Sequence, residues 1–240
     1  MIEKAILEHL YLTEKLSVAE IAQKLRSTFP RTLYWVKKHG IPIRSCSERT
    51  YVKFNPKGDP FCPKTQLTSK EKELFLTGLV IYWAEGSRKI RFNVQVVNMD
   101  YRMLQLFVRF LRDIVRVDES RLRLEVRVYH GFDRGGAHRY WSRFLKLRMS
   151  QVRVYPHIDH RSDPNKQWSP YGIATVSVSN TKLKIWLDQQ LEKNIQQLLD
   201  QWSFSEAAPK GKLSSIVKEE TATYAYGRPV DHSWITTCTG

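Results

Sequence analysis

One acidic residue is the main candidate for catalysis in this sequence. Glu85 ends an apolar run that starts at Leu74, and Gly86 and Ser87 follow it directly. A carboxylate at the C-terminal end of a buried helix is unfavourable, because its charge opposes the helix dipole and burial disfavours ionisation. A divalent metal ion or an opening toward nucleic acid explains this position, and so does a solvent-exposed helix end. We therefore regard Glu85 as the candidate catalytic residue and metal ligand.

Three segments alternate apolar and polar residues with the period of a β-strand, namely 90–98, 121–129 and 173–179. In the first segment, Phe92, Val94 and Val96 are expected to face the core. Arg, Asn and Gln dominate the opposite side of the first two segments, with Glu125 among them, and these residue types hydrogen bond to base edges in the major groove. A solvated sheet is the alternative, although it more often mixes Lys, Glu and Thr. The candidate DNA-binding residues of these strands are Arg91, Asn93, Gln95, Arg121, Arg123 and Arg127.

Three short helices are predicted in the first forty residues. The first covers residues 3–13, where Ile6, Leu7, Leu10 and Leu12 have helical spacing. Ser17 and Glu20 have the spacing of a capping box, which predicts the start of the second helix. The third is expected to begin after Thr28, with Pro30 in its first turn, and to end at Gly40.

The second and third helices, joined by a tight connection, predict a helix-turn-helix whose second helix is basic. On a recognition helix the outward residues near the N-terminus reach base edges, whereas later basic residues lie near phosphates. The candidates are Phe29, Arg31 and Tyr34 for base contact, and Lys37 and Lys38 for phosphate contact. The stretch 20–42 resembles the helix-turn-helix segments of resolvases and of phage or intron-associated DNA-binding proteins. A small helical bundle without a nucleic-acid role is the alternative.

The charge of the chain favours a polyanionic partner. Its 240 residues include 39 Lys and Arg against 24 Asp and Glu, which gives a formal net charge of +15. Hydrophobic residues make up 42% of the sequence, so we expect a packed protein rather than a disordered basic tail. No apolar run approaches the roughly 18 residues of a membrane span, and the N-terminus lacks the apolar region of a signal peptide. We therefore expect no membrane partner and an intracellular location, cytoplasmic or nucleoid-associated.

The chain is expected to be an α+β protein with two domains. Residues 1–45 form the helix-turn-helix domain, and residues 46–67 lose periodicity and contain the Pro and Gly typical of a linker. Residues 68–203 form the main α+β domain. Its helix over 70–85 is apolar on nearly all sides and is therefore expected to be buried between neighbours. Residues 204–240 are predicted to be a poorly structured tail.

The main domain resembles a LAGLIDADG homing-endonuclease domain over residues 70–203. The resemblance depends on the motif GLVIYWAEGS at 78–87 and on the polar-faced strands and flanking helices that follow it. Two positions of the motif depart from the family pattern: Val80 stands in place of its central Gly, and Trp83 in place of its inner Asp.

In that family the motif helices of two domains pack together, the acidic residue of each coordinates a divalent metal at the scissile phosphates, and four-stranded saddles contact the DNA. The resemblance therefore implies that Glu85 binds Mg²⁺ and that the strand residues named above line a saddle. The sequence has no second acid-Gly motif, so a catalytic pair requires a homodimer through the 70–85 helix. Related scaffolds also occur in transcription regulators that bind DNA without cleaving it.

Three functions stay open at this point. The leading one is sequence-specific binding of double-stranded DNA by the helix-turn-helix and the saddle domain, as in a regulator. The first alternative is a Mg²⁺-dependent DNA endonuclease of the homing type. The second is an RNA-binding, maturase-like splicing cofactor, since homing-endonuclease scaffolds have been adapted to that role.

Overall fold

A computed structural model of the chain describes residues 2–87, 89–129, 131–156 and 170–201. The chain divides into two compact units, residues 1–60 and 61–240. Helices and a four-stranded mixed sheet make up these units, which confirms the α+β class. Within the described residues, no helix is both long and apolar enough to cross a membrane. The predicted tail, 204–240, lies outside the described residues.

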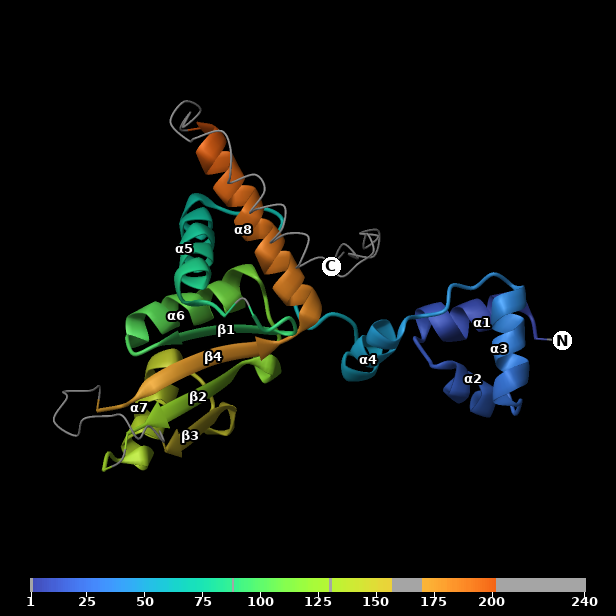
Figure 1. The fold of residues 1–240 in the computed structure, drawn as a ribbon, viewed down its shortest axis with the longest axis horizontal. Coiled ribbons are helices and arrows are strands. Elements are labelled where there is room, and N and C mark those ends of the chain that lie inside the picture. Colours follow the sequence, from blue (N-terminus) through green and yellow to red (C-terminus); the bar gives the residue numbers. More distant parts are fainter. Residues whose placement is uncertain (1, 88, 130, 157–169, 202–240) are drawn as a thin grey trace. The chain divides into compact units, whose positions relative to one another are not determined.

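The first unit is helical (Figure 1). Its elements are α1 (Lys4–Glu8), the π-helical turn η1 (His9–Thr13), α2 (Val18–Lys24), α3 (Phe29–Lys38) and α4 (Cys46–Phe54). Leu7, Leu10 and Tyr11 are buried, whereas Ile6 and Leu12 are 42% and 49% exposed. The buried residues Leu7, Leu10 and Tyr11 are three and four positions apart and share one face of the helix, whereas Ile6 and Leu12 lie beside that face.

The ends of α2 and α3 follow the predicted signals with one difference. The Glu20 amide donates to Ser17 Oγ at 3.2 Å, and the Ser17 amide donates to Glu20 Oε2 at 2.7 Å, so the capping box is confirmed. Thr28 is the N-cap of α3, but its side chain makes no capping hydrogen bond. Gly40 has φ of +68° just after α3, which is the left-handed conformation that ends many helices.

The predicted linker contains a helix. α4 has its own capping box, in which the Ser45 amide donates to Glu48 Oε2 at 2.6 Å and the Glu48 amide donates to Ser45 Oγ at 3.2 Å. No side chain of α4 is buried, so the segment lacks the apolar periodicity that would reveal a helix. Residues 55–67 form no helix or strand.

The second unit is built around one sheet. Its elements are α5 (Ser69–Glu85), β1 (Asn93–Asn98), α6 (Tyr101–Arg109), the π-helical turn η2 (Phe110–Ile114), the short 3₁₀ turn η3 (Glu119–Arg121), β2 (Arg123–Val128), α7 (Arg134–Leu145), a second 3₁₀ turn η4 (Met149–Gln151), β3 (Val152–Pro156), β4 (Ile173–Ser179) and α8 (Thr181–Gln201). The three predicted strands correspond to β1, β2 and β4. β3 was not predicted; it has only five residues and ends at Pro156.

The strands lie in the order β1-β4-β2-β3 (Figure 1). β4 is antiparallel to both β1 and β2, and β3 is parallel to β2. Val176 of β4 lies opposite Val96 on one side and Leu124 on the other, and all three side chains are fully buried. Together with their alternate neighbours they form the core face of the sheet, against which α6 and α7 pack.

Gly78 allows α5 to pack closely on η2. It is buried, and a Cβ at this position would overlap the ring of Phe110, lying 2.6 Å from Cδ1. Real Cβ atoms do not approach so closely, and Phe110 is itself fully buried. The two elements therefore depend on the absence of a side chain at Gly78.

We expect Gly78→Ala to destabilise the second unit by about 1–3 kcal/mol, because the added methyl group overpacks a filled core. The measurement is urea unfolding followed by circular dichroism. Lys72→Ala, at an exposed position of the same helix, is the control and should change stability by less than about 0.5 kcal/mol. Adding Phe110→Leu should restore part of the loss, and a stability of Gly78→Ala equal to wild type would contradict this account of the packing.

Candidate nucleic-acid interface

One face of the sheet packs against helices and forms the core. The other face carries no buried side chain among the described residues, and we call it the open face. Residues that lie directly opposite each other on neighbouring strands point to the same side. The register places Gln95, Ser177 and Arg123 in one row, and Glu125 beside Arg153 in the next. None of the side chains on this face is buried. The open face consists of Asn93, Gln95, Val97, Arg123, Glu125, Arg127, Arg153, Tyr155, Ile173, Thr175, Ser177 and Ser179.

The structure brings four of the six predicted strand residues together on the open face: Asn93, Gln95, Arg123 and Arg127. The other two lie outside the strands. Arg91 is in a turn before β1, and Arg121 is the last residue of η3. Phe92, predicted to face the core, is 63% exposed, because the strand begins one residue after it and the alternation does not extend to it.

Two residues of the open face, Arg153 and Tyr155 on β3, were not predicted from the sequence. Both are exposed, and the register places them opposite Glu125 and Arg127 of β2. The signal was present, because Val152 and Val154 alternate with them and pack toward the core. It extends over only a few residues before Pro156, which is too short to separate a strand from a loop.

Some side chains of the open face form hydrogen bonds within the protein, and others do not. Asn93 Nδ2 donates to Gln95 Oε1 at 3.0 Å, and Arg123 Nη1 donates to the Ser120 and Leu122 carbonyl oxygens at 2.5 and 2.9 Å. Arg127 and Arg153 are exposed and form no ion pair or hydrogen bond with any described residue.

Arginines of the helical side of the unit are more often paired. Arg102 lies 2.8 Å from Asp100, Arg109 lies 3.1 Å from Asp113, and Arg112 lies 2.7 Å from Glu119. Arg112 also donates to the carbonyl oxygens of Leu145 and Lys146, so its guanidinium joins the end of α7 to η2. These pairs reduce the positive potential of that side, although Arg116, Arg134 and Arg143 form no ion pair with a described residue. Arg127 and Arg153 also form none, and Glu125 is the acid nearest to them in register.

Glu85 lies at the edge of the sheet beside β1. A β-bridge joins Gly86 to Val96, and the Ser87 amide donates to the Gln95 carbonyl oxygen at 3.2 Å. This pairing is an isolated bridge, and no strand is formed between α5 and β1 among the described residues. A Cβ at Gly86 would overlap the carbonyl oxygen of Tyr82 and lie 2.7 Å from its Cδ2, so a glycine is required for this close approach.

A polar cluster of the buried Tyr82 and Lys184 with the half-exposed Asp188 fixes the position of the end of α5. Tyr82 donates to Asp188 Oδ1 at 2.8 Å, and Lys184 Nζ lies 2.9 Å from the same oxygen and also bonds the Tyr82 hydroxyl. The Lys184 side chain is 4% exposed, so its charge depends on these two partners. The cluster joins α5 to α8 one turn before Glu85.

The Glu85 side chain is exposed and forms no ion pair with a described residue. Its setting is therefore that of a solvated helix end rather than a buried carboxylate. The described residues contain no group of three or more His, Cys, Asp or Glu side chains that could hold a metal ion. Glu85 is therefore a single exposed carboxylate, without a second acid or His beside it among the described residues.

α5 is not buried on all sides, which corrects the prediction. Leu79 and Tyr82 are buried, but Leu76, Val80 and Trp83 are 45%, 58% and 51% exposed. These three exposed residues are spaced by four and then three positions, so they lie along one side of the helix. Val80 and Trp83, the two departures from the LAGLIDADG pattern, therefore lie on the surface of this unit.

The five candidate residues of α3 are all exposed. Thr32 and Val36 are buried and mark the core side of the helix, whereas Arg31, Tyr34 and Lys38 follow one another at helical spacing on the opposite side. Lys38 Nζ lies 5.6 Å from the centre of the Tyr34 ring. Lys37 borders this stripe, but Phe29 precedes Thr32 by three residues and so lies toward the core side.

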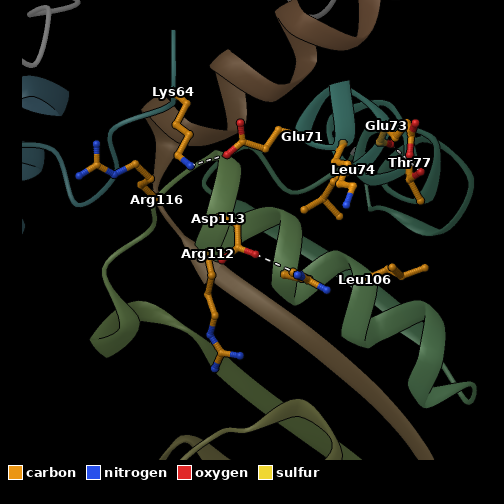
Figure 2. A pocket seen from close by; sticks show the side chains of 11 residues that line it. Lys64, Glu71, Glu73, Leu74, Thr77, Leu106, Arg112, Asp113 and Arg116 are labelled. Atoms are coloured by element: carbon orange, nitrogen blue, oxygen red, sulfur yellow. Dashed lines mark hydrogen bonds and ion pairs between the residues drawn. The ribbon is translucent and has the colours of Figure 1, made fainter. Parts of the chain in front are cut away.

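An open pocket of about 760 Å³ lies between α5 and the α6–η2 segment (Figure 2). Cations and acids line it together, and Figure 2 shows Lys64 directed at Glu71 and an ion pair at Asp113. The Lys64–Glu71 distance is 2.6 Å and the Arg109–Asp113 distance is 3.1 Å. These two ion pairs reduce the positive potential of the pocket, although Lys70 and Arg116 also line it and form no ion pair with a described residue.

No protein-family model, curated protein or solved structure matches this chain. The functional assignment therefore depends on the residues and geometry described above.

Glu71 gives a prediction about pH. The ion pair with Lys64 and the hydrogen bonds from Thr68 lower the pKa of Glu71 from 4.5 to about 2. A carboxyl whose pKa is lowered by folding stabilises the folded state above its unfolded pKa, and this contribution disappears as the pH falls through the folded pKa. The stability advantage of wild type over Glu71→Gln should therefore be full above about pH 5 and shrink between pH 4.5 and 2.

The measurement is the urea midpoint of both proteins from pH 7 down to pH 3. Glu73→Gln is the matched control, since Glu73 is an exposed acid on the same helix turn without a side-chain partner among the described residues. A difference between wild type and Glu71→Gln that stays constant with pH would rule out the ion pair as its source.

Proposed function

We propose that this protein binds double-stranded DNA sequence-specifically through α3 and through the open face of the sheet, in the manner of a regulator. The observation that carries the proposal is the pair Arg127 and Arg153. Both are exposed on the open face, and neither forms an ion pair or hydrogen bond with a described residue. Uncompensated arginines on a surface attract phosphates, and their planar guanidinium groups suit both phosphate and guanine.

The open face has the composition of a surface that reads bases. It presents two amide side chains and three arginines, together with small hydroxyl residues on β4 that leave room for a groove wall. A sheet can lie against the major groove, where each base pair has a distinct pattern of donors and acceptors. The resemblance to the LAGLIDADG saddle supports the same orientation.

α3 supplies the second module. Arg31 and Tyr34 lie on its exposed stripe near the N-terminus, and Lys37 and Lys38 follow them. A helix of this kind enters the major groove with its first residues at the bases. Two linked modules recognise a longer site than either alone and raise the affinity by their effective concentration.

The first experiment compares two pairs of arginines by titrating a fluorescent duplex. Replacing Arg127 and Arg153 together by Ala should weaken duplex binding by about tenfold or more, because each lost charge-assisted hydrogen bond is worth about 1.5–3 kcal/mol. Replacing Arg134 and Arg143 of α7, also exposed and without described partners, should weaken it by less than about threefold. Equal losses in the two variants would mean that charge alone binds DNA and would contradict the proposal. Tighter binding of structured RNA than of any duplex would favour the RNA-binding alternative.

The second experiment separates the two kinds of contact on α3. Arg31→Ala should relax the base preference at one or two positions of the selected site, at about 1–3 kcal/mol, whereas Lys37→Ala should weaken all sequences alike. Binding to a set of single-base variants of the site measures both effects. The same profile for the two variants would show that the proposed orientation of α3 is wrong.

The alternative to a DNA-binding regulator is a Mg²⁺-dependent endonuclease, which is favoured by the positions of Glu85 and of the exposed apolar residues of α5. Glu85 is exposed beside β1, at the border of the proposed DNA surface, and the stripe Leu76, Val80 and Trp83 offers an apolar surface for a second copy of the chain. In a homodimer the second copy would supply the second carboxylate, and DNA phosphates would complete the metal ligands.

Glu85→Gln tests the alternative directly. If the protein cuts DNA, this substitution should abolish nicking of a bound duplex with Mg²⁺ or Mn²⁺ and leave binding without metal unchanged or slightly tighter, because a carboxylate near phosphates is removed. Glu73→Gln on the same helix is the matched control, and a chelator shows that cutting needs metal. Cleavage that survives Glu85→Gln would exclude Glu85 as the metal ligand. Absence of cleavage by wild type on its selected site would leave DNA binding as the function.

A further inference from the structure

Glu125 is the one acidic residue of the open face among the described residues. It lies on β2, between β4 and β3 in the sheet, with Thr175 and Arg153 directly opposite it. Arg123 and Arg127 lie two residues away along the same strand and on the same face. A carboxylate therefore stands in the middle of three arginines.

The carboxylate of Glu125 is not engaged by these neighbours. It is exposed and forms no hydrogen bond or ion pair with a described residue, although three guanidinium groups are near in register. The Arg123 guanidinium instead bonds the carbonyl oxygens of Ser120 and Leu122. The acceptor sites of both carboxylate oxygens are thus available to a ligand.

A carboxylate on a surface that binds phosphates is unfavourable unless it meets a hydrogen-bond donor. In the major groove only two donors are offered by the bases, the 4-amino group of cytosine and the 6-amino group of adenine. Adenine places the N7 acceptor beside its amino group, and this lone pair repels a carboxylate, which can only accept. Cytosine has no such acceptor at its major-groove edge.

We propose that Glu125 accepts a hydrogen bond from the 4-amino group of a cytosine and thereby sets a C·G preference at one position of the DNA site. This inference rests on the proposed function and assigns one determinant of its specificity. Arg127 and Arg153 flank the carboxylate and offset its repulsion of the phosphates. Their guanidinium groups can donate to the O6 and N7 atoms of guanine. The open face can therefore contact cytosine through Glu125 and guanine through the arginines.

The experiment is selection of binding sites from a randomised duplex library by the full chain, followed by affinity measurements on single-base variants of the selected site. Three proteins are compared: wild type, Glu125→Gln, and Glu192→Gln as a matched loss of one exposed acid on α8. Glutamine keeps the size of the side chain but both donates and accepts, so it pairs with the N6 and N7 atoms of adenine.

Wild type and Glu192→Gln should both prefer cytosine at one position, by about 5- to 100-fold over the other bases. Glu125→Gln should lose this preference or move it to adenine at that position, with the other positions unchanged. Equal base preferences in all three proteins, with at most a uniform rise in affinity for Glu125→Gln, would overturn the inference and leave the proposed function in place. Wild type that binds duplexes without any base preference, or not at all, would overturn both.

Discussion

The alternate side chains of β1, β4 and β2 pack into one apolar layer with α6 and α7, and this packing fixes the register of the sheet. Because side chains alternate, a shift of one residue would exchange the buried valines for the polar residues between them. The same constraint that builds the core therefore holds Gln95, Arg123 and Arg127 on the open face. Short hydroxyl residues of β4 lie between them, so that the arginines and amides are not crowded.

The end of α5 depends on this sheet and on α8. Gly86 and Ser87 pair with β1, and the Tyr82–Lys184–Asp188 cluster joins the preceding turn to α8. A buried lysine is costly unless its charge is paired, so the cluster favours one arrangement of the two helices. Glu85 is consequently held at a defined place beside the open face while its own carboxylate stays in solvent.

The sequence predicted those features whose signals are local and periodic. Alternation gave β2 and β4 and their outward residues, and the spacing of Ser17 and Glu20 gave the start of α2. Other features have local signals that are short or incomplete. The alternation of β3 extends over only five residues and ends at Pro156, which is too short to separate a strand from a loop. The spacing of Ser45 and Glu48 marks the start of α4, but none of its side chains is buried, so no apolar periodicity follows it. The exposed stripe on α5 was missed because an apolar surface for a partner and an apolar core have the same composition.

The central claim is that duplex DNA contacts the open face rather than the helical side of the sheet, and photocrosslinking tests it most directly. The full chain is bound to its selected duplex carrying 5-iododeoxyuridine at successive positions, irradiated and analysed by mass spectrometry. Tyr155 is the aromatic residue of the open face, whereas Tyr101, Tyr140 and Tyr171 form a cluster on the helical side. The account predicts crosslinks to Tyr155 and, from α3, to Tyr34. Crosslinks to the tyrosine cluster of the helical side, with none to Tyr155, would contradict it.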